Sequence, residues 1–103
     1  MASFDRNAYR ELNLYAENDY ETYQRQQAFA ASYKKKAQKG TYNPLKAEKG
    51  LRHVTDFAAR KYAKEFGGNS RTMFPGSVRN AVARSQRRYV EREYLGFNRA
   101  RVR

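Results

Sequence analysis

The sequence predicts an all-α protein, and three observations support this class. Apolar residues recur every three or four positions along most of the chain. No segment alternates apolar and polar residues as a half-buried strand does, and the valines are scattered among charged residues. Alanine, the strongest helix former, occupies fourteen positions. We expect one small domain of three or four helices over residues 1–96, followed by a basic tail, residues 97–103, that is disordered when free.

The first helical stretch runs from about Asp5 to Ala16. Asp5 is of the type that caps a helix N-terminus, because its carboxylate accepts a hydrogen bond from a free N–H of the first turn. Tyr9, Leu12 and Ala16 follow at helical spacing and form the expected buried face.

The second stretch runs from about Asp19 to Gln38. Glu21 lies three residues after Asn18, which resembles a loose capping box. Lysines near its end suit the carbonyl end of a helix, and Gly40 is able to adopt the left-handed closing conformation. The expected apolar stripe of this helix is Tyr20, Tyr23, Ala30, Tyr33 and Ala37, with Phe29 beside it.

The third stretch runs from about Pro44 to Phe66, with Asn43 as its N-cap and proline at its first position. We expect Gly50 to split off a first turn and residues 67–68, both glycine, to end the helix. The positions that follow a 3.6-residue period are Leu51, Val54, Phe57, Ala58, Tyr62 and Phe66.

Residues 69–76 are expected to form a loop before a fourth stretch. This stretch takes Ser77 as its N-cap and runs to about Leu95, where Gly96 stops it. Its apolar line is Val78, Val82, Tyr89, Val90 and Tyr94, and its opposite side carries arginines. The core should be thin, since the chain has five Leu, five Val, six Phe and no Ile.

Charge gives the strongest functional signal. The net charge of +12 divides into −2 over residues 1–33 and +14 over residues 34–103, which favours association with nucleic acid or another anionic surface. Arginine outnumbers lysine, and a guanidinium binds phosphate bidentately and stacks on bases. Like charges four residues apart oppose helix formation, so Arg84, Arg88 and Arg92 are unexpected on a bare surface. The candidate contact residues are Arg79, Arg84, Arg87, Arg88, Arg92, Arg99, Arg101, Arg103, Lys34, Lys35, Lys36 and Lys39.

Catalytic chemistry has little support in the sequence. His53 is the only histidine and there is no cysteine, so we expect no catalytic, cofactor-binding or metal site and a non-enzymatic protein. The acids Glu17, Asp19 and Glu21 are interpreted as charges near a helix N-terminus. The glycines at 67–68 and 76 lack the spacing of a phosphate-binding loop.

The nature of the anionic partner stays open between DNA, RNA and an acidic protein. A helix-turn-helix reading would place Arg79, Asn80 and Gln86 at base edges, but residues 67–76 are longer than the usual turn of that motif. Tyr89 and Tyr94, interleaved with arginines, offer stacking faces for RNA or belong to the core. A further alternative is that the arginine-bearing face of the fourth stretch binds no partner and only keeps the protein soluble.

The leading hypothesis is a nucleic-acid-binding accessory component of a larger assembly. The alternative is a protein-binding adaptor or inhibitor, for example one encoded by a bacteriophage, that docks on an acidic surface of a host protein. In composition the chain is similar to accessory proteins of ribosomes or bacteriophages, without a shared motif. We expect no secretory signal, no membrane span and a cytoplasmic location, free or bound to a ribosome-like or virion particle; self-association is left open.

Overall fold

A computed structural model describes residues 4–96 of the chain, which contain helices and no strand. The all-α class is therefore confirmed, whereas the tail with Arg99, Arg101 and Arg103 lies outside the described residues. None of the helices described is both long enough and apolar enough to cross a membrane. The helices are α1 (Arg6–Asn18), α2 (Tyr20–Gln38), α3 (Pro44–Phe66), α4 (Ser70–Met73) and α5 (Gly76–Glu93).

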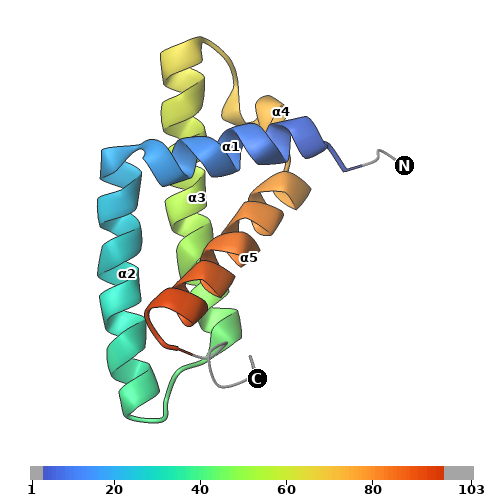
Figure 1. Ribbon diagram of the computed structural model, residues 1–103. Coiled ribbons are helices and arrows are strands. Elements are labelled where there is room, and N and C mark those ends of the chain that lie inside the picture. The colour runs from blue at the N-terminus through green and yellow to red at the C-terminus, as the bar shows by residue number, and fades with distance from the viewer. Residues whose placement is uncertain (1–3, 97–103) are drawn as a thin grey trace.

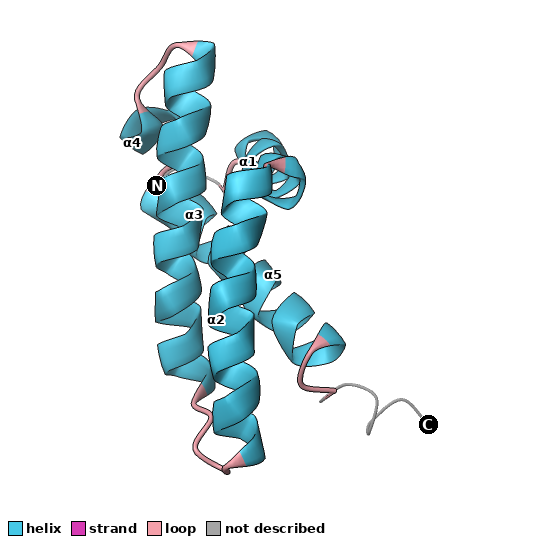
Figure 2. Cartoon of the chain, turned by 90° about the vertical axis from the view of Figure 1, so that its left-hand side faces the viewer, coloured by secondary structure: helices cyan, strands magenta, loops and turns pink. Residues whose placement is uncertain are grey.

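The long helices α2 and α3 lie side by side as an antiparallel pair (Figures 1 and 2). Helices α1 and α5 cross the same face of α3, and they also contact each other. The short helix α4 lies in the segment expected to be a plain loop. This arrangement places α5 against the middle of the molecule, with one side toward α3 and another toward α1 and solvent.

Two apolar clusters hold the layers together, and both are built largely from small side chains. One joins α1, α3 and α5 through Leu12, Ala58 and Val82, and includes Phe74 from the segment between α4 and α5. The other joins α2, α3 and α5 through Ala30, Leu51, Val54 and Val90, among others. The small residues let the helices approach closely, which is how so few large apolar side chains can form a core.

Several of the expected helix ends are confirmed by their hydrogen bonds or backbone angles, among them the end of α2, where Gly40 has a φ of 77°. Asp5 Oδ1 accepts the N–H of Ala8 at 3.0 Å, and Asn43 Oδ1 accepts the N–H of Leu45 at 2.9 Å. Gly67 closes α3 with a φ of 74°, a left-handed conformation that favours glycine. The first helix, however, continues two residues beyond its expected end at Ala16, to Asn18.

Two expected N-caps are wrong. Helix α5 begins at Gly76, one residue before Ser77, and no side chain caps it, because Pro75 already occupies the cap position. Helix α2 is capped by Asp19 and not by Asn18. The Asn18 side chain instead donates to the carbonyl of Leu14, and Glu21, expected in a capping box, pairs with Lys61.

Asp19 is the single residue between α1 and α2, and it serves both helices. Its backbone N–H donates to the carbonyl of Tyr15 at 2.9 Å, which closes α1. Its carboxylate accepts the N–H and the hydroxyl of Thr22, at 3.0 and 2.9 Å, which opens α2. Lys61 Nζ of α3 lies 2.7 Å from the same carboxylate. The corner between the two helices is thus fixed to α3 by one side chain.

Gly50 does not split α3, contrary to the expectation from sequence. The helix continues through it, and its missing side chain leaves room for two aromatic residues of α2. A Cβ at this position would lie 2.9 Å from Phe29 and would overlap the hydroxyl of Tyr33. That hydroxyl donates to the carbonyl of Ala47 at 3.1 Å. Gly50 is therefore a packing residue and not a helix breaker.

The buried faces of the helices differ in part from the apolar stripes expected. Tyr20 and Tyr23 of α2 are exposed, contrary to expectation. Ala30 and Tyr33 are buried as expected, and Thr22 is buried with them. The hydroxyl of Thr22 can be buried because it donates a hydrogen bond to Asp19. Tyr9 and Phe57 are half-buried, and Phe66 and Tyr89 are exposed.

Candidate nucleic-acid interface

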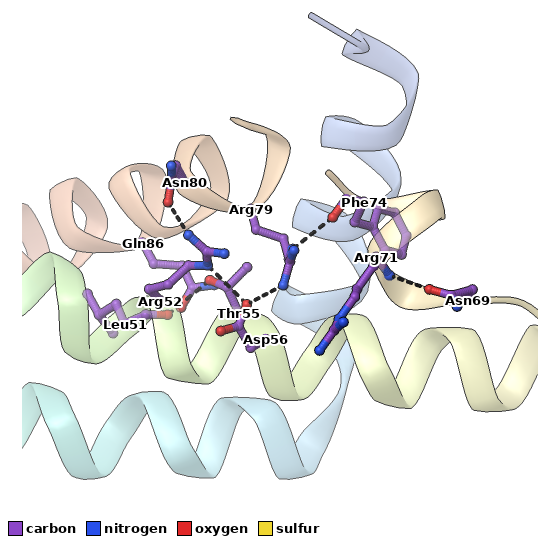
Figure 3. A network of polar contacts seen from close by, with 10 residues as sticks. All are labelled: Leu51, Arg52, Thr55, Asp56, Asn69, Arg71, Phe74, Arg79, Asn80 and Gln86. Carbon is purple, nitrogen blue, oxygen red and sulfur yellow. Dashed lines mark hydrogen bonds and ion pairs between the residues drawn. The ribbon is translucent and has the colours of Figure 1, made fainter. Parts of the chain in front are cut away.

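The five arginines of α5 fall into two groups, and the first group is held inside the fold. Arg79 Nη1 lies 3.0 Å from Asp56 of α3, and its Nε donates to the carbonyl of Phe74 at 2.7 Å (Figure 3). Arg87 lies 2.9 Å from both Glu48 and Glu91. The two side chains are only 18% and 20% exposed. Their guanidiniums are thus already matched by carboxylates.

The second group, Arg84, Arg88 and Arg92, forms one line at four-residue intervals along the outer side of α5. Arg84 and Arg92 are each 48% exposed. Arg84 approaches Glu48 only to 3.9 Å, and Arg92 pairs with its neighbour Glu93 at 3.1 Å. Arg88 is exposed and makes no ion pair or hydrogen bond with any residue from 4 to 96. This line is the part of α5 available to an external anion.

The line of arginines forms one wall of an open groove between α1 and α5. The groove has a volume of about 400 Å³. Its other lining includes Phe4 and Tyr9, at the start of the chain, and Tyr89, whose ring lies 5.8 Å from the guanidinium of Arg92. Sequence reasoning missed the part of α1, because no local pattern shows which helix packs beside α5. We call this hollow the arginine groove.

The four candidate lysines are not beside the middle of α5. Lys34, Lys35 and Lys36 are exposed at the end of α2, and Lys39 follows directly. Tyr42, in the connection to α3, donates to Glu91 at 2.6 Å, so this connection lies at the C-terminal end of α5 (Figure 1). Burial and the hydrogen bond to Glu91 raise the pKa of Tyr42, which keeps the contact intact at neutral pH. The lysines extend the basic surface toward the end of α5.

The residues considered for base reading are engaged within the fold. Asn80 accepts a hydrogen bond from Arg52, and Gln86 is buried and donates to Thr55 Oγ1 at 3.1 Å (Figure 3). Arg79 is paired with Asp56. Residues 67–76 also contain α4, so α3 and α5 are not joined by a short turn.

The residues considered for catalysis or metal binding are not brought together into a site in the part of the chain that is described. His53 is exposed on α3. Across residues 4–96, no three His, Cys, Asp or Glu side chains come together as metal ligands would.

The acidic side chains have a different distribution from the basic ones. The chain has ten Asp and Glu residues, and all of them lie within the described residues. Each of them accepts a hydrogen bond from, or forms an ion pair with, another group of the protein. Exposed cations such as Arg88, in contrast, have no hydrogen-bond or ion-pair partner among residues 4–96. The acids are Asp5, Glu11, Glu17, Asp19, Glu21, Glu48, Asp56, Glu65, Glu91 and Glu93.

Comparison of the chain with known protein families, with characterised proteins and with solved structures finds no match.

Proposed function

We propose that this protein is a non-enzymatic nucleic-acid-binding protein that contacts phosphates through Arg84, Arg88 and Arg92, as an accessory component of a larger assembly. The observation that carries the proposal is that these three guanidiniums stay exposed in one line. Two other arginines of the same helix, Arg79 and Arg87, are neutralised by carboxylates of the fold. A line of like charges at four-residue spacing opposes helix formation unless an anion meets it.

Charge density favours a nucleic acid as that anion. From Arg84 to Arg92 the helix advances about 12 Å, at 1.5 Å per residue. One strand of duplex DNA carries about three to four phosphates over that length, at one per 3.4 Å of helix axis. A line of guanidiniums on one helix side matches such a row of phosphates, which also accept bidentate hydrogen bonds. The lysines at the end of α2 and the paired Arg79 and Arg87 are predicted to contribute less.

The test is the salt dependence of binding in a triple variant, Arg84→Gln, Arg88→Gln and Arg92→Gln. Loss of three phosphate contacts should lower the slope of log affinity against log salt on duplex DNA by about 2.7. The matched control is Arg60→Gln, Lys64→Gln and Arg71→Gln, which removes the same charge from a separate hollow where α3 meets α4. The control should keep the slope of the parent protein.

Equal losses in the two triple variants would mean that binding follows net charge and that the line of arginines is not the contact. Absence of salt-sensitive binding to both duplex and single-stranded nucleic acid would refute the proposal. Stoichiometric, nuclease-resistant co-purification with one protein would then support the adaptor alternative.

A further inference from the structure

We propose that a second hollow, next to the arginine groove, accepts an unpaired nucleobase, so that the protein binds single-stranded nucleic acid in preference to duplex. The inference rests on the proposed function and specifies its ligand. The hollow lies between α1, α2 and α5 and has a volume of about 340 Å³, within the range of small-ligand pockets. Its lining includes Asn13, Tyr23, Gln26, Gln86 and Tyr89, and we call it the tyrosine hollow.

The tyrosine hollow and the arginine groove are adjacent. Glu17, Ser85 and Tyr89 line both of them. Arg84 and Arg88 flank Ser85 and Tyr89 in the sequence of α5 and line the groove. A nucleotide whose base enters the hollow would therefore hold its phosphate at the arginines. This is the arrangement that single-strand binders use, with a basic groove for the backbone and aromatic faces for the bases.

The two tyrosines of the hollow keep much of their surface free for stacking. Tyr23 is 43% exposed and Tyr89 is 39% exposed. A tyrosine that served only the core would be buried, as Tyr33 is in the second apolar cluster. Burial and the neighbouring tyrosine hydroxyls raise the pKa of Tyr89, so its phenol stays neutral when it meets a base. Tyr89 also lies under Arg92, which places a cation beside the stacking face.

The polar lining suits a base and not a phosphate. Asn13 donates to Glu17 at only 3.5 Å, and Gln26 donates to Gln86 at only 3.4 Å, so both amides hold weak hydrogen bonds. Replacing these weak hydrogen bonds with hydrogen bonds to the edge of a base therefore costs little free energy. The carboxylate of Glu17 accepts a hydrogen bond from an exocyclic amino group, as carried by adenine, cytosine or guanine. Among residues 4–96, no cation lines the hollow, whereas three arginines line the groove. Phosphates are thus directed to the groove and the base to the hollow.

A duplex cannot supply that base without opening. In a helix the bases are paired and stacked, and extracting one has a cost that an unpaired strand avoids. Single strands and duplexes can both make the phosphate contacts at the arginines. The tyrosine hollow therefore adds affinity only for single strands, which gives the inference a measurable signature separate from charge.

The experiment compares three probes: a short single-stranded oligonucleotide of mixed sequence, the same length of abasic sugar-phosphate, and a duplex. The parent protein should bind the single strand roughly tenfold more tightly than the abasic strand. Tyr23→Leu should lose that tenfold preference and keep its affinity for the abasic strand and the duplex. Tyr20→Leu is the matched control, because Tyr20 lies on the same helix and is exposed outside the hollow, and its affinities should not change.

Equal binding of the complete and abasic strands by the parent protein would overturn the inference while leaving phosphate binding intact. So would a Tyr23→Leu variant that keeps its preference for the complete strand. Failure of all three probes to bind would instead refute the proposed function itself. An unchanged melting temperature of Tyr23→Leu shows that any loss is not caused by unfolding.

Discussion

The dual role of Asp19 leads to a quantitative prediction about stability. Replacing it with alanine removes the N-cap of α2, which is worth about 1 kcal/mol. The same change removes a charged acceptor from the buried hydroxyl of Thr22, which adds about 1.5 kcal/mol. We therefore expect Asp19→Ala to lower the free energy of unfolding by about 2.5 kcal/mol. For a domain of this size that corresponds to a fall in melting temperature of roughly 10–20 °C.

Asp5→Ala is the internal control for this prediction. Asp5 caps α1 with the same 3.0 Å hydrogen bond to the third residue of its helix, but it makes no hydrogen bond or ion pair with another helix among the described residues. Its loss should lower the free energy of unfolding by about 1 kcal/mol only. Urea unfolding followed by circular dichroism measures both variants. Equal losses in the two variants would refute the claim that Asp19 does more than cap a helix.

The pH dependence of the same residue gives a second measurement. Burial alone would raise the pKa of Asp19, but hydrogen bonds from Lys61 and Thr22 outweigh it and lower the pKa below its usual value. The unfolded chain thus binds a proton more readily than the folded one. The stabilisation is present above about pH 4 and is lost as the pH falls through the lowered pKa. Asp19→Asn retains a capping group but cannot be protonated in this way, so this variant should lose less stability as the pH falls.

Three further predictions concern packing, alkaline pH and the groove. Gly50→Ala should destabilise the protein by about 1–3 kcal/mol in urea unfolding, although alanine is the better helix former, because the new Cβ meets Phe29 and Tyr33. Gly76→Ala should not destabilise it, because a Cβ added there meets no other element or side chain within 4 Å. Burial raises the pKa of Tyr33 to about 12. The contribution of Tyr33 to stability should therefore hold below about pH 10 and disappear as the pH rises toward 12. The Tyr33→Phe variant should not show this loss in melting curves taken across that range. Glu17→Gln removes a negative charge from the lining of the arginine groove and should tighten binding of the abasic strand several-fold at low salt. An unchanged affinity would contradict the placement of phosphates in the groove.

Much of the fold could be predicted from the sequence because helix ends depend on local chemistry. Asp5, Asn43 and Gly67 mark their helix ends through groups within a few residues. Helix α4 could not be predicted, since four residues are too few to show a helical period. The burial of Phe74 beside Tyr62, with ring centroids 5.1 Å apart, depends on how the chain returns to α3.

The candidate site was visible in the sequence only as a set of charges. The line of Arg84, Arg88 and Arg92 follows from helical spacing alone. Which arginines of α5 are neutralised could not be predicted, because Arg79 and Arg87 pair with Asp56 and Glu48, 23 and 39 residues away. The tyrosine hollow needs three helices at once, and no local pattern indicates it.

Apart from Glu17, which lines both the groove and the hollow, the acids and the outer arginines differ in role: the acids hold the fold together, and the arginines are left for the proposed partner. Acids such as Asp56 and Glu48 hold helices together. The exposed arginines add little to that framework, since Arg84 approaches Glu48 only to 3.9 Å and Arg92 pairs within α5. The two sets can therefore vary independently. Under the proposed function, changes among the outer arginines should alter binding of the partner without weakening the scaffold, whereas loss of Asp56 leaves the internal Arg79 without its carboxylate. Added salt should also act in opposite directions, easing repulsion within the free protein and weakening its complex.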